Sequence, residues 1–254
     1  MKPSISEWGH HVAKSFVLAR FFFLTCVGIF ISAGEFFYQY GNIESFKVLN
    51  RLGSSDYDIF FVLITQFGDS LLVCALISIL FARKYPLEVL TCWIVVHFAG
   101  LIVQLLKHLF FEDWGRPGLV LGIENIYAVG TPEIYHTFPS GHACTAFITA
   151  FWVATVIEKK FFGLGILAAI IAGVIAYSRI YLGVHFLRDI LAGGIIGITI
   201  GTAIYSASES FFRKKFHLKK KKVAKFLIYL GILGLIISII RFFYQTKMLF
   251  FEAL

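Results

Sequence analysis

His185 and Asp189 are spaced for a hydrogen bond between an imidazole and a carboxylate. Residues four apart on a helix share a face, so the two side chains can meet. A carboxylate on one imidazole nitrogen fixes the tautomer and raises the nucleophilicity of the other nitrogen, as an attack on phosphorus requires. A structural polar pair is the alternative interpretation of this spacing taken alone.

The stretch from Pro139 to His142 (PSGH) has the composition of an anion-binding helix N-terminus. Gly141 permits a tight turn with exposed backbone N–H groups, and Ser140 can cap the helix and also donate to a phosphate. His142 would then lie beside the bound group as a general acid for a departing oxygen. The alternative is an ordinary helix cap followed by an interfacial histidine.

Three cations, Lys107, Arg116 and Arg179, lie near the ends of apolar runs. Without a matching number of acids they would repel one another unless an anion lay between them. Phosphoryl oxygens meet that need, because guanidinium groups bind them bidentately and an ammonium group supplies point charge. Snorkelling toward lipid headgroups is the alternative, and it suits Lys107 better than Arg179.

The apolar runs must position these residues. The chain is 58% hydrophobic and 15% charged, with a mean hydropathy of +0.81, which is more apolar surface than a soluble domain of this length needs to bury. We therefore expect an all-α, polytopic membrane helix bundle of six spans and a seventh, C-terminal helix, for which an interfacial helix is the alternative. The predicted spans are Ser15–Phe37, Tyr57–Ala82, Pro86–Phe111, Ala143–Ile157, Phe161–Ala176, Ile190–Ala207 and Phe226–Tyr244.

Three segments are expected along the chain. Residues 1–56 hold an N-terminal segment, a first span that is retained rather than cleaved, and an outer loop. Residues 57–209 form the catalytic core, in which 112–138, with four glycines, one tryptophan and two tyrosines, lies on the membrane surface as a rim around the site. Residues 210–254 combine a basic cytoplasmic segment with the C-terminal hydrophobic helix.

The distribution of lysine and arginine predicts the orientation. Basic residues cluster at alternate ends of the spans, and these ends are expected to face the cytoplasm of a bacterial inner membrane, which leaves the three polar stretches at the periplasmic side. Topology and anionic headgroups also explain the net charge of +8, so no nucleic-acid partner is expected. The residues assigned to the cytoplasm are Lys2, Lys14, Arg83, Lys84, Lys159, Lys160 and the cluster from Arg213 to Lys222.

The remaining polar residues are expected to be structural. Gln66, Asp69 and His97 are interpreted as buried polar groups that bond to a neighbouring helix, and the four cysteines as packing residues. Glu112 and Asp113 are adjacent, so both cannot face one ion from a helix. Neither a metal ion nor another cofactor is expected.

Together the three stretches resemble the signature of the type-2 phosphatidic acid phosphatase superfamily: K-x6-RP, PSGH and SR-x5-H-x3-D. The second and third elements match in full, and the resemblance covers about 57–207. It implies a metal-independent phosphatase with a six-helix core that acts on a lipid phosphate in the bilayer through a phosphohistidine intermediate. By position, the resemblance makes His185 the nucleophile, Asp189 its orienting acid, His142 the general acid, and Arg116, Ser140, Gly141 and Arg179 the phosphate ligands.

The first element departs from this signature, because eight residues instead of six separate Lys107 from Arg116. On a continuous helix a step of nine residues is about 2.5 turns and would put the two side chains on opposite faces. The stretch must therefore unwind if both are to reach one phosphate. Lys107 is either a phosphate ligand or a structural or headgroup residue.

The stretch WGRP, 114–117, resembles a variant among bacterial lipid A phosphatases, which makes lipid A the preferred substrate. Undecaprenyl diphosphate, phosphatidylglycerol phosphate and phosphatidate are alternatives, as is transfer of the phosphoryl group to another lipid. A transporter would show repeated halves with ionisable residues near mid-membrane, and the sequence has no such symmetry. A catalytically inactive lipid-binding member would lack motif residues that are present here. The sequence does not indicate an oligomeric state.

Overall fold

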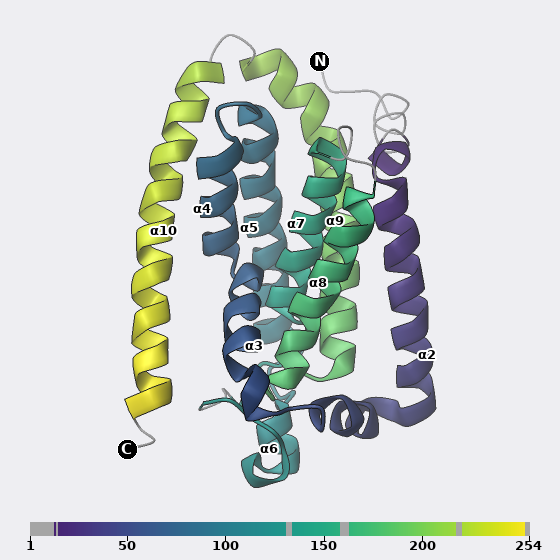
Figure 1. Ribbon diagram of the computed structural model, residues 1–254. Coiled ribbons are helices and arrows are strands. Elements are labelled where there is room, and N and C mark those ends of the chain that lie inside the picture. Colours follow the sequence, from purple (N-terminus) through teal and green to yellow (C-terminus); the bar gives the residue numbers. More distant parts are fainter. Residues whose placement is uncertain (1–12, 14, 131–133, 158–162, 217–219, 252–254) are drawn as a thin grey trace.

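The computed structural model describes residues 13, 15–130, 134–157, 163–216 and 220–251, and the side chains of 209–216 and 245–251 lie outside the description. The described residues form helices and loops without strands, so the predicted all-α bundle is confirmed (Figure 1). The α-helices are α2 (Arg20–Asn50), α3 (Asp58–Thr65), α4 (Ser70–Phe81), α5 (Pro86–Leu109), α6 (Pro117–Leu121), α7 (Gly141–Val156), α8 (Leu164–Tyr181), α9 (Leu187–Phe216) and α10 (Lys220–Phe251), with short 3-10 helices η1 (Ser55–Tyr57), η2 (Gln66–Gly68) and η3 (Ile123–Asn125).

Helix α7 is the centre of the bundle. It contacts α8, α9 and α5, and most of its residues are buried. Phe147 and Phe151 belong to a core shared with α2, α8 and α9, whereas Trp152 belongs to a second core shared with α4, α5 and α10. Because α7 is covered on both sides, its N-terminus, which carries the PSGH stretch, is fixed by two independent cores.

The span predicted over Tyr57–Ala82 is broken. Helix α3 ends at Thr65, η2 follows, and α4 starts at Ser70 at an angle of 74° to the preceding helices. Asp69 caps α4 by accepting from the backbone N–H groups of Leu71 and Leu72 at 3.0 and 2.9 Å. This cap explains the break, because it starts a new helix inside the apolar run.

Five helices are long and apolar enough to cross a membrane, or six if the broken pair counts as one span. Helix α7, with 16 residues, is apolar but shorter. The first predicted span extends beyond its expected end: α2 continues to Asn50 after a kink at Gly41, and its last part lies across the lower end of the bundle (Figure 1). The chain is thus a multi-pass membrane protein.

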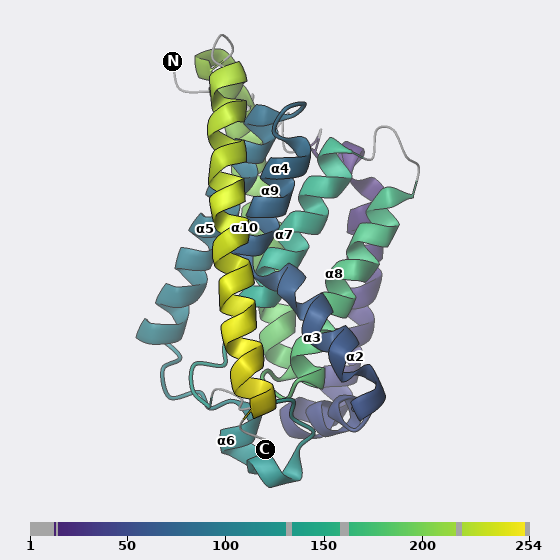
Figure 2. The ribbon, with the colours of Figure 1, turned by 60° about the vertical axis from the view of Figure 1, so that its left-hand side comes forward.

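Helix α10 passes the same test of length and composition over Lys220–Tyr244. It packs along α4 and α5, on the side of the bundle opposite α2 (Figure 1), and the view of Figure 2 shows that it follows the others over nearly their whole length. This arrangement agrees with a seventh span rather than with an interfacial helix.

Candidate active site

His185 and Asp189 meet at the lower end of the bundle in Figure 1, where α8 ends and α9 begins. The Nδ1 atom of His185 lies 3.4 Å from the Oδ2 atom of Asp189, and the two residues are 2% and 0% exposed. With Nδ1 facing the carboxylate, Nε2 is the ring nitrogen left for chemistry. The predicted pairing of the two side chains is therefore present in the structure.

The turn between α8 and α9 brings His185 back toward Arg179. Gly183 has φ +72°, and its N–H donates to the carbonyl of Ile180 at 3.0 Å, while the N–H of Val184 donates to the carbonyl of Arg179 at 3.0 Å. These bonds form a Schellman motif, in which a left-handed glycine ends a helix. A side chain at Gly183 would also lie 2.8 Å from the Tyr127 carbonyl. The Schellman turn therefore accounts for the spacing of five residues between Arg179 and His185.

Asp189 does more than face the histidine. It lies in the first turn of α9, and its Oδ2 accepts from the backbone N–H of Phe186 at 2.8 Å, which is half of a capping box. Its backbone carbonyl accepts from the N–H of Ser140 at 2.9 Å, so the second and third motifs are joined directly. This close approach needs Gly193, because a Cβ atom there would come within 2.3 Å of the Ser140 carbonyl.

Thr137, which the sequence analysis did not identify, contacts both His185 and Asp189. Its hydroxyl donates to Oδ2 of Asp189 and lies 3.4 Å from Nδ1 of His185, and the residue is fully buried. The other carboxylate oxygen, Oδ1, faces Nε of Arg188 at 3.4 Å. The only sequence signal for Thr137 is its place two residues before Pro139, because a lone hydroxyl in a loop carries no pattern of its own.

Lys107 and Arg116 both reach this end of the bundle because the chain unwinds between them, as predicted. Helix α5 ends at Leu109, and Arg116 caps the short helix α6. The Nζ of Lys107 donates to the carbonyl of His136 at 2.8 Å, and Nε of Arg116 donates to the carbonyl of Tyr135 at 2.8 Å. At 7% and 6% exposure, neither side chain snorkels to the surface.

Arg179 approaches from α8, and its Nη1 donates to the hydroxyl of Thr65 at 2.9 Å, at the end of α3. We call Lys107, Arg116 and Arg179 the outer cation group, after the side of the membrane that the sequence predicts for them. Burial, followed by the positive charges of Arg116, Lys107 and Arg179, holds the pKa of His185 well below its usual range. The imidazole is therefore neutral at neutral pH, which is the form that can attack.

The PSGH stretch starts α7 as expected. Ser140 is the N-cap, and its hydroxyl accepts from the N–H of Ala143 at 3.4 Å. Gly141 does not adopt a left-handed conformation, and a Cβ atom on it would meet only Val103, at 3.8 Å. The expected tight turn at Gly141 is therefore wrong: this glycine is helical, and its lack of a side chain leaves open space beside the helix N-terminus.

His142 packs against the break between α3 and α4. A Cβ atom added to Gly68 would lie 2.8 Å from both Cβ and Cδ2 of His142. Gln66 and Asp69, on either side of Gly68, flank this contact. The sequence analysis interpreted Gln66 and Asp69 as structural. The only sequence signal for a close approach here is a glycine within an apolar run.

The three polar residues predicted to bond to neighbouring helices behave differently from one another. Asp69 faces Arg241 of α10 at 3.4 Å, but Gln66 donates to Val62 of its own helix at 3.2 Å. His97 is exposed, stacks on Trp93 and bonds to the Trp93 carbonyl at 2.9 Å, also within its own helix. The prediction is wrong for Gln66 and His97, because a backbone carbonyl one turn earlier satisfies each of them.

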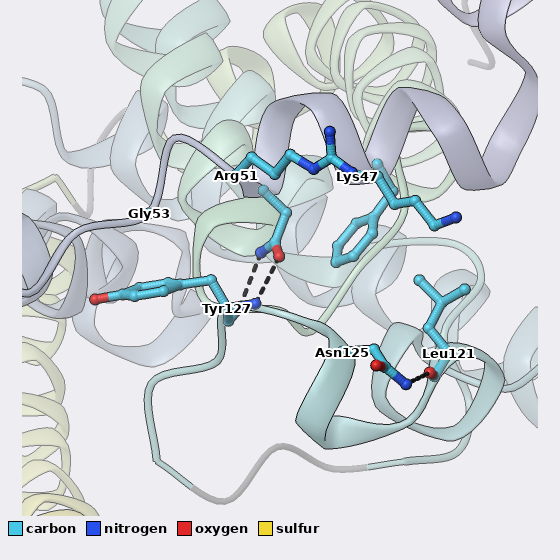
Figure 3. Close-up of a pocket in the computed structure, with 8 residues that line it drawn as sticks. Lys47, Arg51, Gly53, Leu121, Asn125 and Tyr127 are labelled. Atoms are coloured by element: carbon cyan, nitrogen blue, oxygen red, sulfur yellow. Dashed lines mark hydrogen bonds between the residues drawn. The ribbon is translucent and has the colours of Figure 1, made fainter.

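An outer pocket of about 500 Å³ lies at the same end, between the last turns of α2 and the segment of α6 and η3 (Figure 3). Lys47 and Arg51 line it from α2, and Leu121 and Asn125 line it from the other side (Figure 3). Asn50 closes its base by accepting from Tyr127 N–H at 2.8 Å and donating to the Tyr127 carbonyl at 2.9 Å. The pocket is separate from the outer cation group and adds two more cations to this end.

No group of three or more histidine, cysteine, aspartate or glutamate residues that could hold a metal ion occurs within the part of the chain that the structure describes. The four cysteines are free and buried, in agreement with a packing role: Cys26, Cys74, Cys92 and Cys144. The motif residues at this end are two histidines, His142 and His185, one carboxylate, Asp189, and the three cations of the outer cation group.

A family model, described as PAP2 superfamily, matches residues 86–213. The chain belongs to the PAP2 superfamily. The match contains every motif residue named above and leaves α2, α3, α4 and α10 outside it. As a member of this family of membrane lipid phosphatases, the chain is a hydrolase of lipid phosphate esters.

Similar proteins carry different substrate names. The chain is 27% identical to lipid A 4'-phosphatase of Porphyromonas gingivalis over 168 residues, covering 63% of this chain and 70% of that protein. It is 24% identical to undecaprenyl-diphosphatase of Sulfolobus acidocaldarius over 157 residues, covering 61% of this chain and 73% of that protein. The crystal structure of Aquifex aeolicus LpxE is similar with a TM-score of 0.55 and 29% identity, covering 63% of this chain and 92% of that one.

Proposed function

We propose that this PAP2 protein removes a phosphate from a membrane lipid at the periplasmic face through a phosphohistidine on His185. The observation that carries the proposal is the meeting of the His185 and Asp189 pair with cations from α5, α8 and the 110–116 loop at one end of the bundle. Preorganised cations stabilise the charge that develops on phosphoryl oxygens in the transition state.

In the proposed reaction Nε2 of neutral His185 forms a bond to phosphorus while the bond from phosphorus to the lipid oxygen breaks. His142 gives its proton to that oxygen, so the lipid leaves as a neutral alcohol. Water then attacks the phosphorus, His142 takes a proton from the water, and the bond between Nε2 and phosphorus breaks, so inorganic phosphate leaves and His185 is free again. Asp189 and Thr137 hold Nδ1 in place throughout, while Arg116, Arg179, Ser140, Gly141 and Lys107 surround the phosphoryl group.

Lipid A is the proposed substrate. The WGRP stretch and the similarity to the Porphyromonas gingivalis lipid A 4'-phosphatase favour it. The outer pocket adds a physical reason, because Lys47 and Arg51 suit a headgroup with a second anionic group besides the one that is cleaved. Phe46, which lines that pocket, packs on Phe186 next to His185, with ring centroids 5.3 Å apart.

The test is phosphate release by the purified full chain from lipid A, undecaprenyl diphosphate, phosphatidylglycerol phosphate and phosphatidate. We expect lipid A to be turned over fastest, and an acid-labile phosphoenzyme to be trapped in a rapid quench. His185→Ala should abolish both the turnover and the phosphoenzyme, whereas His97→Ala, which changes an exposed histidine of α5, should abolish neither.

Ordinary turnover by His185→Ala would refute the mechanism. Faster turnover of undecaprenyl diphosphate than of lipid A would be compatible with the mechanism but would contradict the proposed substrate. Undecaprenyl diphosphate is the second candidate because of the similarity to the undecaprenyl-diphosphatase of Sulfolobus acidocaldarius. Formation of a phosphorylated second lipid in place of free phosphate would show that the protein transfers the phosphoryl group to a lipid rather than to water.

A further inference from the structure

A second group of basic residues lies at the end of the bundle opposite the candidate active site. Arg83 and Lys84 lie in the turn between α4 and α5, and Lys220, Lys221 and Lys225 lie in the first two turns of α10. All five line one open cavity of about 550 Å³, which we call the basic cavity. Figures 1 and 2 both show the start of α10 beside the turn between α4 and α5.

The basic cavity is part of the fold, because α10 is packed tightly against α4. A Cβ atom on Gly231 would lie 2.8 Å from Cβ of Ser78 and 2.9 Å from the Ala75 carbonyl, so the two helices are in direct contact. Leu227, between this contact and the cavity, is 1% exposed. The lysines of α10 are thus held beside Arg83 and Lys84 by an integral helix.

Positive charges predominate among the described residues of the basic cavity. None of the described residues that line it is acidic. Glu88, four residues after Lys84 on α5, is the nearest described acid in sequence; with Lys84 set against it, four cations remain: Arg83, Lys220, Lys221 and Lys225. Like charges gathered at one cavity raise the energy of the folded protein unless an anion or salt screens them.

The walls of the basic cavity indicate which anion fits. Apolar and aromatic residues line the same cavity: Pro86 and Ala224, both buried, Ile228 and Tyr229. A free phosphate would use only the charged rim, whereas a phospholipid has a charged phosphate next to acyl chains and matches both parts. Basic pockets between membrane helices on the cytoplasmic side are known as sites for anionic headgroups.

We propose that the basic cavity binds the headgroup phosphate of an anionic phospholipid in the leaflet opposite the catalytic centre. Naming the cytoplasmic leaflet depends on the proposed orientation, whereas the cavity itself does not. A general bias of lysine and arginine toward the cytoplasm explains why cations lie at this end. It does not explain why cations from two elements line a single cavity together with apolar residues.

The experiment measures lipid binding to the purified full chain in a neutral detergent, by native mass spectrometry and by thermal unfolding. The probe is phosphatidylglycerol, whose phosphate is a diester and so is no substrate for a phosphomonoesterase. Phosphatidylcholine and inorganic phosphate are the comparison ligands. Because a ligand of the folded state raises the unfolding temperature, phosphatidylglycerol should do so at concentrations where the other two do not.

The variant Lys221→Gln/Lys225→Gln tests the site, and Lys222→Gln is the matched control, because Lys222 is exposed on the same helix but does not line the cavity. We expect phosphatidylglycerol to bind at least about tenfold more weakly to the double variant and unchanged to the control. Equal binding of phosphatidylcholine, an equal effect of inorganic phosphate, or the same loss in Lys222→Gln would overturn the proposal. His185→Ala should bind phosphatidylglycerol normally, so failure of the catalytic mechanism and failure of this site give different results.

Discussion

The two ends of the bundle both gather cations, but they hold them differently. In the outer cation group, Lys107 and Arg116 are almost fully buried, and each donates to a backbone carbonyl that fixes its position. The cations of the basic cavity are all exposed. Fixed, desolvated charges cost no reorganisation when a transition state forms, whereas exposed lysine side chains lose conformational freedom when they bind an anion. The difference fits the two proposed roles, catalysis at the outer cation group and ligand binding at the basic cavity.

Exchanging the type of cation at each end gives the largest expected contrast. Arg116→Lys keeps the charge but loses the planar fork and the bond to Tyr135, so kcat/KM should fall about 100- to 1000-fold. The matched change at the other end, Arg83→Lys, keeps an exposed charge and should alter kcat/KM less than about twofold. Phosphate release from the preferred lipid measures both. Similar losses at the two ends would show that the comparison is wrong.

Thr137 offers the next largest effect. Thr137→Val removes the hydroxyl that donates to Asp189 while keeping the shape of the side chain, so kcat should fall about 10- to 100-fold with little change in KM. Thr137→Ser should restore most of the activity, because it keeps the donor. If Val and Ser variants were equally slow, the role of Thr137 would be packing rather than orientation of the carboxylate.

Gly68 tests how closely the general acid is held. Gly68→Ala would place a methyl group 2.8 Å from His142 and displace it, so we expect kcat to fall about tenfold or more. Gly100→Ala is the control, since a Cβ atom there meets nothing within 4 Å and alanine favours a helix. Steady-state kinetics and thermal unfolding of both variants distinguish a displaced histidine from a destabilised fold. Unchanged kcat in Gly68→Ala would remove His142 from the proposed role of general acid.

Much of this arrangement could be predicted because its signals are local. The spans follow from runs of apolar residues. The pairing of His185 with Asp189 was expected from a four-residue spacing on one helix, but only Asp189 is helical: His185 lies in the turn before α9, and the two side chains still meet. The unwinding was predicted because Lys107 and Arg116 could not both reach one phosphate from a continuous helix. In the structure α5 ends at Leu109. Each of these features can be predicted from residues that are close together in the sequence.

The features that were missed depend on contacts between distant segments. Thr137 reaches Asp189 across 52 positions, and Thr65 reaches Arg179 across 114 positions. Gly68 and Gly193 have meaning only because His142 and Ser140 lie against them. His97 was misjudged for a related reason: hydropathy places a residue in a span but does not say which face of the helix is buried.

The pH dependence tests whether the outer cation group acts on the nucleophile. The pKa of His185 lies well below its usual range because of burial and then because of the surrounding positive charges. Only the neutral imidazole attacks, so the acid limb of phosphoenzyme formation should lie below the pH at which free histidine titrates. Arg116→Gln removes one charge, which raises the pKa of His185 and moves the limb to higher pH; Arg83→Gln should not move it. Rapid-quench rates across pH measure both, and identical limbs would mean that Arg116 does not act on His185 electrostatically.

A chelator should have the smallest effect. In many phosphoryl transfers a divalent metal neutralises the phosphoryl oxygens, but here Lys107, Arg116 and Arg179 bring three positive charges to the proposed position of the same oxygens. Phosphate release after EDTA treatment and desalting should therefore stay within about twofold of the untreated protein. Strong inhibition that added Mg²⁺ reverses would show that the outer cation group depends on a diffusible ion. In that case the cations at the two ends of the bundle would differ only in their burial. Each group would then depend on a bound partner, a metal ion at the outer cation group and an anion at the basic cavity.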